Sequence, residues 1–297
     1  VSFQIYKGEI LGLVGESGCG KSVTSLSVMQ LLKDTPGKVT HGQVLLDGQD
    51  LLKLSVGEIR AIRGGRMSMI FQEPMSALNP SMRIDRQMME TIMLHTDKNK
   101  EQARAHAADM LKKVGIPDPP RVLKNYPHQL SGGMRQRVMI AMALSCDPEL
   151  LIADEPTTAL AVTIQAQILD LMKKLQKEAQ SSILLITHDL GVVAEMCSRV
   201  IVMYAGKIVE EAPVSELFNH PTPPDPQGLI ASVPHLGSGV KVLPSIPGSV
   251  PDLASMPKGC RFAPRCRYAT AKCHEQEPEL VTVGENQRCR CWLKQEG

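Results

Sequence analysis

Short apolar runs and amphipathic segments alternate along the first 72 residues. Residues 9–14 form an apolar run typical of a buried strand, and apolar positions recur at helical spacing over residues 22–32. Two further runs, at residues 43–48 and 66–71, predict additional strands. The alternation of strand and helix signals predicts an α/β core for this part of the chain.

The pattern becomes helical over residues 84–148, with the main helices predicted at 87–94, 101–114 and 133–144. The α/β alternation then returns, and it predicts strands at 150–153 and 183–187, a helix at 165–179, and a hairpin of 200–203 with 207–209. We therefore expect an α/β core with an inserted helical subdomain at about 84–148.

Proline, glycine and serine dominate the chain from residue 221 onward. This composition is typical of loops, and the segment ends in a cluster of cysteines. We expect a first domain at 1–225, followed by a loop-rich, cysteine-clustered C-terminal extension at 226–297.

The composition of the 297-residue chain excludes several classes of protein. The 33 Lys and Arg residues nearly balance the 31 Asp and Glu residues, so charge gives no argument for a nucleic-acid partner. No apolar run approaches the length of a membrane span, and no signal peptide is visible. We expect a cytosolic protein that reaches a membrane only through a partner. The chain starts at Val1 and enters the first strand almost at once, so we expect that the natural N-terminus is missing.

Residues 15–22 read Gly-Glu-Ser-Gly-Cys-Gly-Lys-Ser, the spacing of a phosphate-binding P-loop. A glycine-rich turn between a strand and a helix aims successive backbone N–H groups at one point, where the helix N-terminus adds positive potential. Lys21 is expected to reach the β- and γ-phosphates of a nucleotide, and the Ser22 hydroxyl to bind Mg²⁺.

Two acids follow the apolar strand predicted at 150–153. A buried strand beside the P-loop strand would deliver Asp154 and Glu155 to the nucleotide. Asp154 suits the Mg²⁺ shell, and Glu155 suits the base that orients the attacking water. The alternative is a strand that ends in a solvated acidic turn.

Ser131, Gly132 and Gly133 precede the helix predicted at 133–144. The amides at a helix start form an anion site, and one nucleotide does not need two such sites from one chain. We infer that this site binds the γ-phosphate held by another subunit. A simple N-cap by Ser131 is the alternative, and the two interpretations are compatible.

These motifs occur in the order found in ATP-binding cassette (ABC) ATPases, and the chain resembles that family over residues 1–220. The order is residues 15–22, Gln72, residues 130–136, Asp154-Glu155 and His188. The chain most resembles the ATPase subunits of dipeptide/oligopeptide and nickel importers. That closer resemblance lies in the cysteine-bearing tail and in residues 71–80, 126–129, 187–190 and 203–206.

The resemblance implies a role for each matching residue. Gln72 would contact Mg²⁺ and the attacking water, Glu155 would be the catalytic carboxylate, and His188 would contact the γ-phosphate. Ser131 and Gly133 would complete the site of the opposite subunit. The residues implied to bind ATP are Gly15, Ser17, Gly18, Gly20, Lys21, Ser22, Ser131, Gly132, Gly133 and Gln136, and those implied to bind Mg²⁺ are Ser22, Gln72 and Asp154.

The chain departs from the family pattern at two places. The aromatic residue that stacks on adenine in the family would lie before Val1. The family also has an aspartate in the loop after the catalytic glutamate, where this chain has Ala161. A carboxylate that helps the two subunits communicate is therefore absent from this position.

The cysteines of the tail have no Cys-x-x-Cys spacing of the kind that binds zinc. A cytosolic ATPase is not expected to use disulfides, whereas four thiolates can hold an iron–sulfur cluster. In the peptide-importer relatives this tail is associated with a [4Fe–4S] centre. The resemblance implies Cys260, Cys266, Cys273 and Cys291 as ligands, with Cys289 competing for the fourth position. Zinc and free thiols are the alternatives.

The resemblance as a whole implies an ATP-hydrolysing subunit that powers import of di- or oligopeptides. The implied partners are two transmembrane permease subunits, a second ABC ATPase subunit in a hetero- or homodimer, and an extracytoplasmic solute-binding protein, with no nucleic acid. The implied location is peripheral, on the cytoplasmic face of the inner membrane. Nickel or glutathione import, a soluble non-transport ABC ATPase, and a module that binds but no longer hydrolyses ATP remain alternatives.

Overall fold

The computed structural model describes residues 1–32, 35–73, 77–158, 160–220, 248–252 and 255–295. The chain divides into two compact units. The terminal unit, which contains both chain ends, consists of Val1–Ile5, Ile10–Ser22 and Leu185–Gly297. The central unit consists of Tyr6–Glu9 and Val23–Leu184.

The central unit contains two parallel strands, β4 (Met67–Ile70) and β5 (Leu150–Asp154). Met67 lies opposite Leu150 and Ile70 opposite Ala153, so the carboxyl ends of both strands lie at the same edge. Smaller elements of this unit are the hairpin of β2 (Leu45–Leu46) and β3 (Gln49–Asp50), helix α2 (Val56–Ile62), and the start of β6 (Ser182–Ile186).

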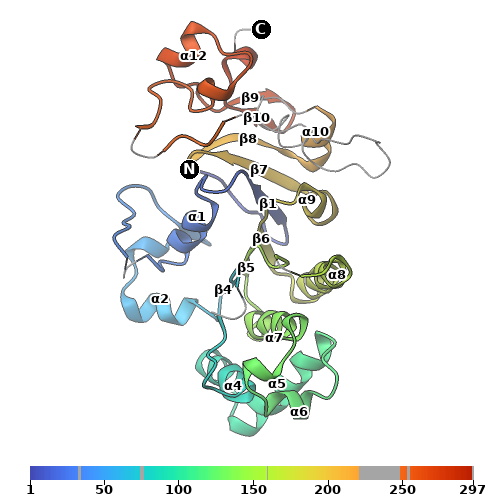
Figure 1. The fold of residues 1–297 in the computed structure, drawn as a ribbon. Helices are drawn as coiled ribbons and strands as arrows, with labels where there is room; N and C mark the ends of the chain where they lie inside the picture. The colour runs from blue at the N-terminus through green and yellow to red at the C-terminus, as the bar shows by residue number, and fades with distance from the viewer. Residues whose placement is uncertain (33–34, 74–76, 159, 221–247, 253–254, 296–297) are drawn as a thin grey trace. The chain divides into compact units, whose positions relative to one another are not determined.

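The helical subdomain of the central unit consists of helices that pack on one another (Figure 1). Their apolar faces are buried, with Met88 and Ile92 on α4 and Leu111 on α5 as examples. Side-chain caps mark the starts of α5, at Asn99, and of α7, at Ser131. The helices are α4 (Ile84–His95), α5 (Lys100–Lys113), α6 (Pro119–Leu123) and α7 (Gly132–Leu144), and the longer helix α8 (Val162–Ala179) follows β5.

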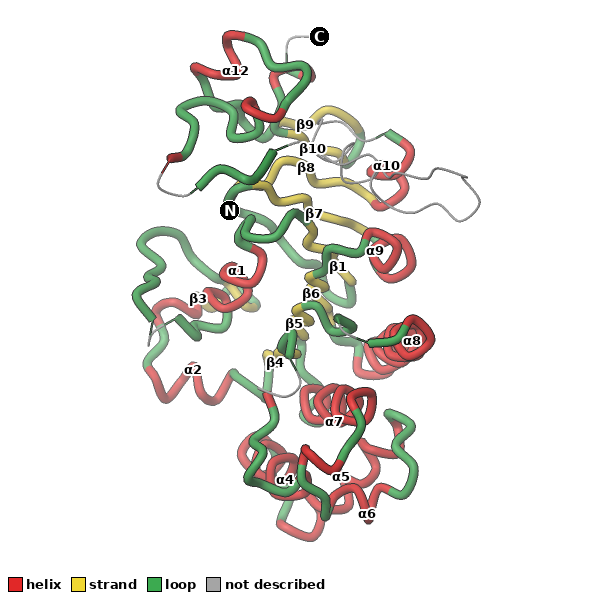
Figure 2. The backbone as a smooth tube through the Cα atoms, viewed as in Figure 1, coloured by secondary structure: helices red, strands yellow, loops and turns green. Residues whose placement is uncertain are grey.

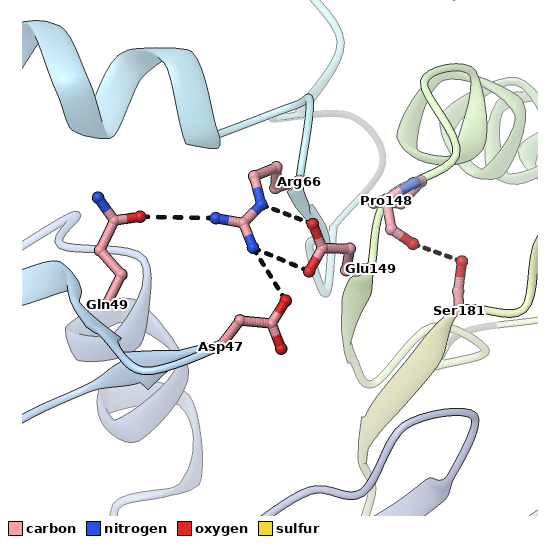
Figure 3. A network of polar contacts seen from close by, with 6 residues as sticks. All are labelled: Asp47, Gln49, Arg66, Pro148, Glu149 and Ser181. Atoms are coloured by element: carbon pink, nitrogen blue, oxygen red, sulfur yellow. Dashed lines mark hydrogen bonds and ion pairs between the residues drawn. The ribbon is translucent and has the colours of Figure 1, made fainter.

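A polar network joins the starts of β4 and β5 to the β2–β3 hairpin (Figure 3). Arg66 donates from Nη2 to Glu149 Oε2 at 3.0 Å and to Asp47 Oδ2 at 3.1 Å. The pairing with Arg66 lowers the pKa of Glu149. The Arg66 guanidinium is partly exposed, and exposed ion pairs contribute little to stability, so the network mainly fixes the hairpin against the strands.

The terminal unit contains both parallel and antiparallel strand pairs, and its strands are yellow in Figure 2. Strand β1 (Ile10–Val14) pairs in parallel with β7 (Arg199–Tyr204), and β7 pairs in antiparallel with β8 (Lys207–Pro213). All five residues of β1 are buried, which matches the apolar run from which the strand was predicted. Helix α1 (Lys21–Val28) begins in this unit, and α9 (Leu190–Met196) and α10 (Val214–Asn219) lie wholly within it.

The C-terminal extension adds structure that its loop-like composition did not predict. Strand β10 (Gln287–Cys289) pairs with β8, and β9 (Val281–Gly284) pairs with β10. A short helix, α12 (Ala271–Glu275), precedes them. Phe262 packs edge-on against Tyr204 of β7, with 5.1 Å between ring centroids. The extension therefore shares the core of the terminal unit. Residues 221–247, which carry the predicted 225/226 domain boundary, lie outside the described residues.

Within the described part of the chain, no helix combines the length and apolarity that a membrane crossing requires.

Candidate nucleotide-binding site

The P-loop joins β1 to α1 in the terminal unit, and its glycines are required by its shape. Gly15 has a φ of 150°, and a Cβ there would lie 2.1 Å from the backbone oxygen of Met203. Gly18 and Gly20 have φ values of 78° and 104°, in the left-handed region that disfavours side chains. No other residue type fits at Gly15 without displacing the β7 backbone.

Lys21 lies at the centre of this loop. Its side chain is buried, and its ammonium donates to the backbone oxygens of Gly15 at 2.8 Å and Glu16 at 3.1 Å. The loop is therefore folded around a positive charge. A cation surrounded by a glycine-rich loop at a helix N-terminus suits the binding of phosphate.

The β7–β8 turn contacts the P-loop, and several other residues of the loop are exposed to solvent. The Gly206 amide donates to the backbone oxygen of Cys19 at 2.9 Å, and the Cys19 side chain is buried. Ser17, Gly18 and Ser22 are exposed. A ligand can therefore reach this part of the loop.

Glu155 and Gln72 meet in the central unit. The Gln72 amide donates from Nε2 to Glu155 Oε2 at 2.9 Å, and the Thr158 hydroxyl donates to the same oxygen at 2.9 Å. Gln72 follows β4 and Glu155 follows β5, so the parallel register of the two strands explains this contact. Asp154, at the end of β5, is buried. The Thr158 contact was missed from the sequence because a threonine in a loop gives no signal.

Glu155 has a φ of 46°, a left-handed value that is uncommon for a residue with a side chain. Such backbone strain costs about 1–3 kcal/mol and persists where the surrounding structure holds it. Here the side-chain bonds to Gln72 and Thr158 hold the carboxylate in place.

The start of α7 has the geometry expected of an N-cap. The Ser131 hydroxyl accepts a hydrogen bond from the Met134 amide at 3.3 Å. A Cβ built on Gly132 would meet nothing within 4 Å, whereas one on Gly133 would lie 3.3 Å from Ile164 Cγ2. The fold therefore does not require glycine at position 132, and a backbone left bare there suits the close approach of a ligand.

Gln136 is almost fully buried, with only 2% of its surface exposed. Its side-chain amide donates to the backbone oxygen of Pro156, the residue after Glu155. This contact ties α7 to the loop that carries Glu155.

His188 follows β6 and belongs to the terminal unit together with the P-loop. Its side chain is exposed, and the next residue, Asp189, caps α9 by accepting from the Gly191 amide at 2.8 Å. The predicted site residues are thus divided. Lys21, Ser22 and His188 lie in the terminal unit, whereas Gln72, Asp154, Glu155 and the α7 start lie in the central unit.

The predicted iron–sulfur cluster, [4Fe–4S], is not supported, and the prediction is wrong. Within the described residues, no group of three or more His, Cys, Asp or Glu side chains is placed to hold a metal ion, which also removes the zinc alternative. The predicted ligands Cys260, Cys266, Cys273 and Cys291 line a mainly apolar cavity with Phe262 and Trp292. None of the cysteines, all of which the structure describes, forms a disulfide.

The physical reason lies in the arrangement of the side chains, which within the described residues do not gather into a group that could hold a metal ion. Burial raises the pKa of Cys260, Cys266 and Cys291. Cys291 borders the cavity, whereas Cys289 is fully buried within β10 and is not among the cavity-lining residues.

Comparisons with known proteins identify the family. A family model described as ABC transporter matches residues 1–158, and one described as Oligopeptide/dipeptide transporter, C-terminal region, matches residues 209–273. The oligopeptide transport ATP-binding protein AppD of Bacillus subtilis (strain 168) is 51% identical over 296 residues, covering 100% of this chain and 90% of that protein. The probable D,D-dipeptide transport ATP-binding protein DdpD of Escherichia coli (strain K12) is 49% identical over 297 residues, covering 100% of this chain and 90% of that protein.

Solved structures agree with this result. The dimeric ATP-binding cassette MJ0796 has a TM-score of 0.63 and 30% identity, covering 71% of this chain and 88% of the cassette. A post-hydrolysis dimer of MJ0796 bound to ADP and Pi has a TM-score of 0.63 and 29% identity, with the same coverage.

The chain belongs to the ABC transporter family. Along its whole length it is similar to the family's ATP-binding proteins of oligopeptide and dipeptide transport. The predicted fold class, an α/β P-loop ATPase core, and the predicted resemblance to peptide-importer ATPases are both confirmed.

Ala161 is the N-cap residue of α8, and no side-chain hydrogen bond caps this helix. Replacing Ala161 by Asp is expected to stabilise the protein by about 1 kcal/mol, because an aspartate carboxylate at this position can accept hydrogen bonds from amides of the first helical turn. The melting temperature should rise by roughly 2–4 °C. Ala166→Asp, at an exposed position inside the same helix, is the matched control and should give no increase. Equal melting temperatures for Ala161→Asp and the starting protein would contradict the prediction.

Proposed function

We propose that this chain is the ATP-hydrolysing subunit of a membrane importer of di- or oligopeptides. The observation that carries the proposal is the similarity along the entire chain, including the C-terminal region, to ATP-binding proteins of peptide transport. The buried Lys21 inside a glycine loop supplies the matching phosphate-binding chemistry.

ATP is bound by the P-loop. The amides of Gly18 and Gly20 and the Ser17 side chain surround the phosphates, with Gly15 allowing the turn. Lys21 exchanges its contacts with the loop oxygens for the β- and γ-phosphates. In the terminal unit Ser22 offers a hydroxyl oxygen, and in the central unit Gln72 and Asp154 offer an amide and a carboxylate oxygen, and oxygen ligands of these kinds suit Mg²⁺. When bound, Mg²⁺ would neutralise phosphate charge.

Glu155 is the residue that orients and polarises the attacking water. Its carboxylate is already fixed by the hydrogen bonds from Gln72 and Thr158. Gln72 is exposed, so its amide can turn toward the same water. His188 contacts the γ-phosphate, and Gln136 holds the Glu155 loop through Pro156.

The start of α7 serves a second subunit. Ser131 and Gly132 are exposed and Gly133 is half-buried, and the amides of this helix start bind the γ-phosphate of ATP held by the neighbouring ATPase. The similarity to the dimeric cassette MJ0796 supports a dimer. The neighbour is a second copy of this chain or a related ABC ATPase.

The importer also contains two transmembrane permease subunits and an extracytoplasmic solute-binding protein. The chain acts at the cytoplasmic face of the inner membrane and attaches to it peripherally through the permease. It is organised as a nucleotide-binding domain at 1–225, with its helical subdomain at about 84–148, and a C-terminal extension at 226–297.

Replacing Lys21 by Ala tests the proposal. We expect ATP turnover in the assembled transporter to fall by at least roughly 10²-fold, because the positive charge that meets the phosphates is lost. ATP-driven uptake of a labelled peptide into vesicles should fall equally. Lys112→Ala, at an exposed position on α5, is the matched control and should leave both rates unchanged. Undiminished turnover in Lys21→Ala would refute the site, and uptake of nickel or glutathione but not peptide would refute the substrate.

A further inference from the structure

An arginine of the C-terminal extension binds the P-loop directly. Arg265 forms a two-pronged ion pair with Glu16, the second residue of the P-loop, with Nη1 to Oε2 at 2.6 Å and Nη2 to Oε1 at 3.0 Å. Both residues belong to the terminal unit. A paired guanidinium and carboxylate with two parallel bonds is the strong form of this interaction.

This ion pair is shielded from solvent. The Arg265 side chain is 6% exposed and the Glu16 side chain 22% exposed. The guanidinium carbon lies 5.8 Å from the ring centroids of Tyr204 and Phe262, and Nη1 also contacts the Tyr204 hydroxyl at 3.3 Å. Pairing with Glu16 raises the pKa of Arg265, so the guanidinium stays charged. The pair thus differs from exposed ion pairs, which solvent weakens.

A second arginine of the extension contacts the β7–β8 turn, which in turn is hydrogen-bonded to the P-loop. Arg261 donates from Nη1 to the backbone oxygen of Ala205, in the β7–β8 turn. The next residue of that turn, Gly206, donates its amide to Cys19 of the P-loop at 2.9 Å. The extension therefore reaches the P-loop along two independent sets of contacts.

We propose that Arg265 is a positioning residue for ATP binding, which neutralises Glu16 and holds its carboxylate away from the incoming phosphates. The proposal rests on the proposed function, because it takes the P-loop as the nucleotide site. Through Arg265 the folded C-terminal extension sets the affinity of the P-loop for ATP.

The physical reason lies in the charge of Glu16. Glu16 follows Gly15 in a loop whose backbone amides and Lys21 are arranged to bind a polyanion. A carboxylate in this loop would repel the phosphates of an incoming ATP, because both carry negative charge. The two bonds from Arg265 cancel this charge and fix the carboxylate toward the extension. Without Arg265, the free carboxylate would oppose the triphosphate and compete for Lys21.

The test measures binding of a fluorescent ATP analogue and ATP turnover in the full chain assembled with its permease. Arg265→Gln is expected to raise the Kd and the KM for ATP about tenfold, with kcat at saturating ATP nearly unchanged. Adding Glu16→Gln in the same chain should restore the affinity to within about twofold of the starting protein. A merely structural role of Arg265 predicts no such rescue, because the double variant has lost the whole ion pair.

Arg267→Gln is the matched control. Arg267 lies two residues further along the extension, is exposed, and stacks on Tyr268 at 4.7 Å. The Arg267→Gln substitution should leave the ATP affinity unchanged. Unchanged affinity in Arg265→Gln, or equal loss in the single and double variants, would overturn the proposal.

Glu16→Gln alone provides a second measurement if Arg265→Gln does not fold by circular dichroism. Removing the carboxylate leaves the guanidinium beside the P-loop, so the affinity for ATP should rise. An unchanged or lower affinity would overturn the proposal. Lys21→Ala separates this failure from failure of the proposed function: if Lys21→Ala loses ATP binding while the Glu16 and Arg265 variants have no effect, the site stands and only the role of Arg265 is refuted.

Discussion

Replacing Glu155 by Gln is expected to lower ATP turnover by roughly 10²–10⁴-fold, the usual contribution of a positioned general base. ATP binding should be retained, and the variant should accumulate as an ATP-bound dimer. Single-turnover hydrolysis and binding of a fluorescent ATP analogue measure the two effects separately.

The structure makes this substitution a clean test of the carboxylate. Gln has the same shape as Glu, and its side-chain oxygen can still accept a hydrogen bond from Gln72 or Thr158. The left-handed backbone conformation at position 155 is similarly unfavourable for Glu and for Gln. The fold is therefore expected to persist while the charge that polarises water is lost.

Glu178→Gln is the matched control for the same charge change. Glu178 is an exposed residue of α8 in the same unit. The turnover and melting temperature of the Glu178→Gln variant should therefore equal those of the starting protein. Turnover at the starting level in Glu155→Gln would show that Glu155 is not the base.

Local patterns predicted the elements that position the site. The apolar runs at 66–71 and 150–153 became the buried parallel strands β4 and β5, whose register brings Gln72 to Glu155. The glycine spacing of the P-loop likewise predicted a loop that wraps around Lys21. These features were predictable because they depend on only a few adjacent residues. A strand shows in a short run of apolar residues, and a left-handed turn shows in the position of a glycine.

Contacts between distant segments were not predictable in this way. Arg265 and Glu16 are 249 positions apart, and neither lies in a pattern that signals its partner. Strands β9 and β10 were missed because their few residues lie in a tail rich in loop-forming residues. The hydrogen bond from the buried Gln136 side chain to Pro156 was also not predictable, because side-chain direction depends on tertiary packing, and the role of Gln136 in nucleotide binding stays a prediction.

The cysteine cluster shows a different limit of sequence reasoning. The resemblance to peptide-importer ATPases implied four thiolate ligands, and the four side chains do border one cavity. Shared location did not produce a metal site within the described residues, because a site also needs ligands that converge on one point. The extension is ordered instead by Phe262, by the two arginines that reach the P-loop region, and by pairing of β10 with β8.

Replacing Ser131 by Arg is expected to lower ATP turnover of the assembled transporter by roughly 10²-fold or more, while ATP binding to the isolated subunit stays nearly intact. Ser131 is exposed at the start of α7, and the bare backbone of Gly132 beside it leaves room for a ligand. A bulky side chain at this point would prevent the amides of α7 from reaching the neighbour's γ-phosphate, and displacement of about 1 Å is enough for a loss of this size.

Ser131→Asn is the matched control, because asparagine caps a helix about as well as serine and adds little bulk. It separates loss of the cap, through which Ser131 accepts from Met134, from obstruction of the neighbour's site. Turnover should therefore stay closer to the starting level in Ser131→Asn than in Ser131→Arg. Loss of ATP binding by the isolated Ser131→Arg subunit would place this loop in the chain's own nucleotide pocket, and normal turnover in the assembled variant would refute a site shared between two subunits.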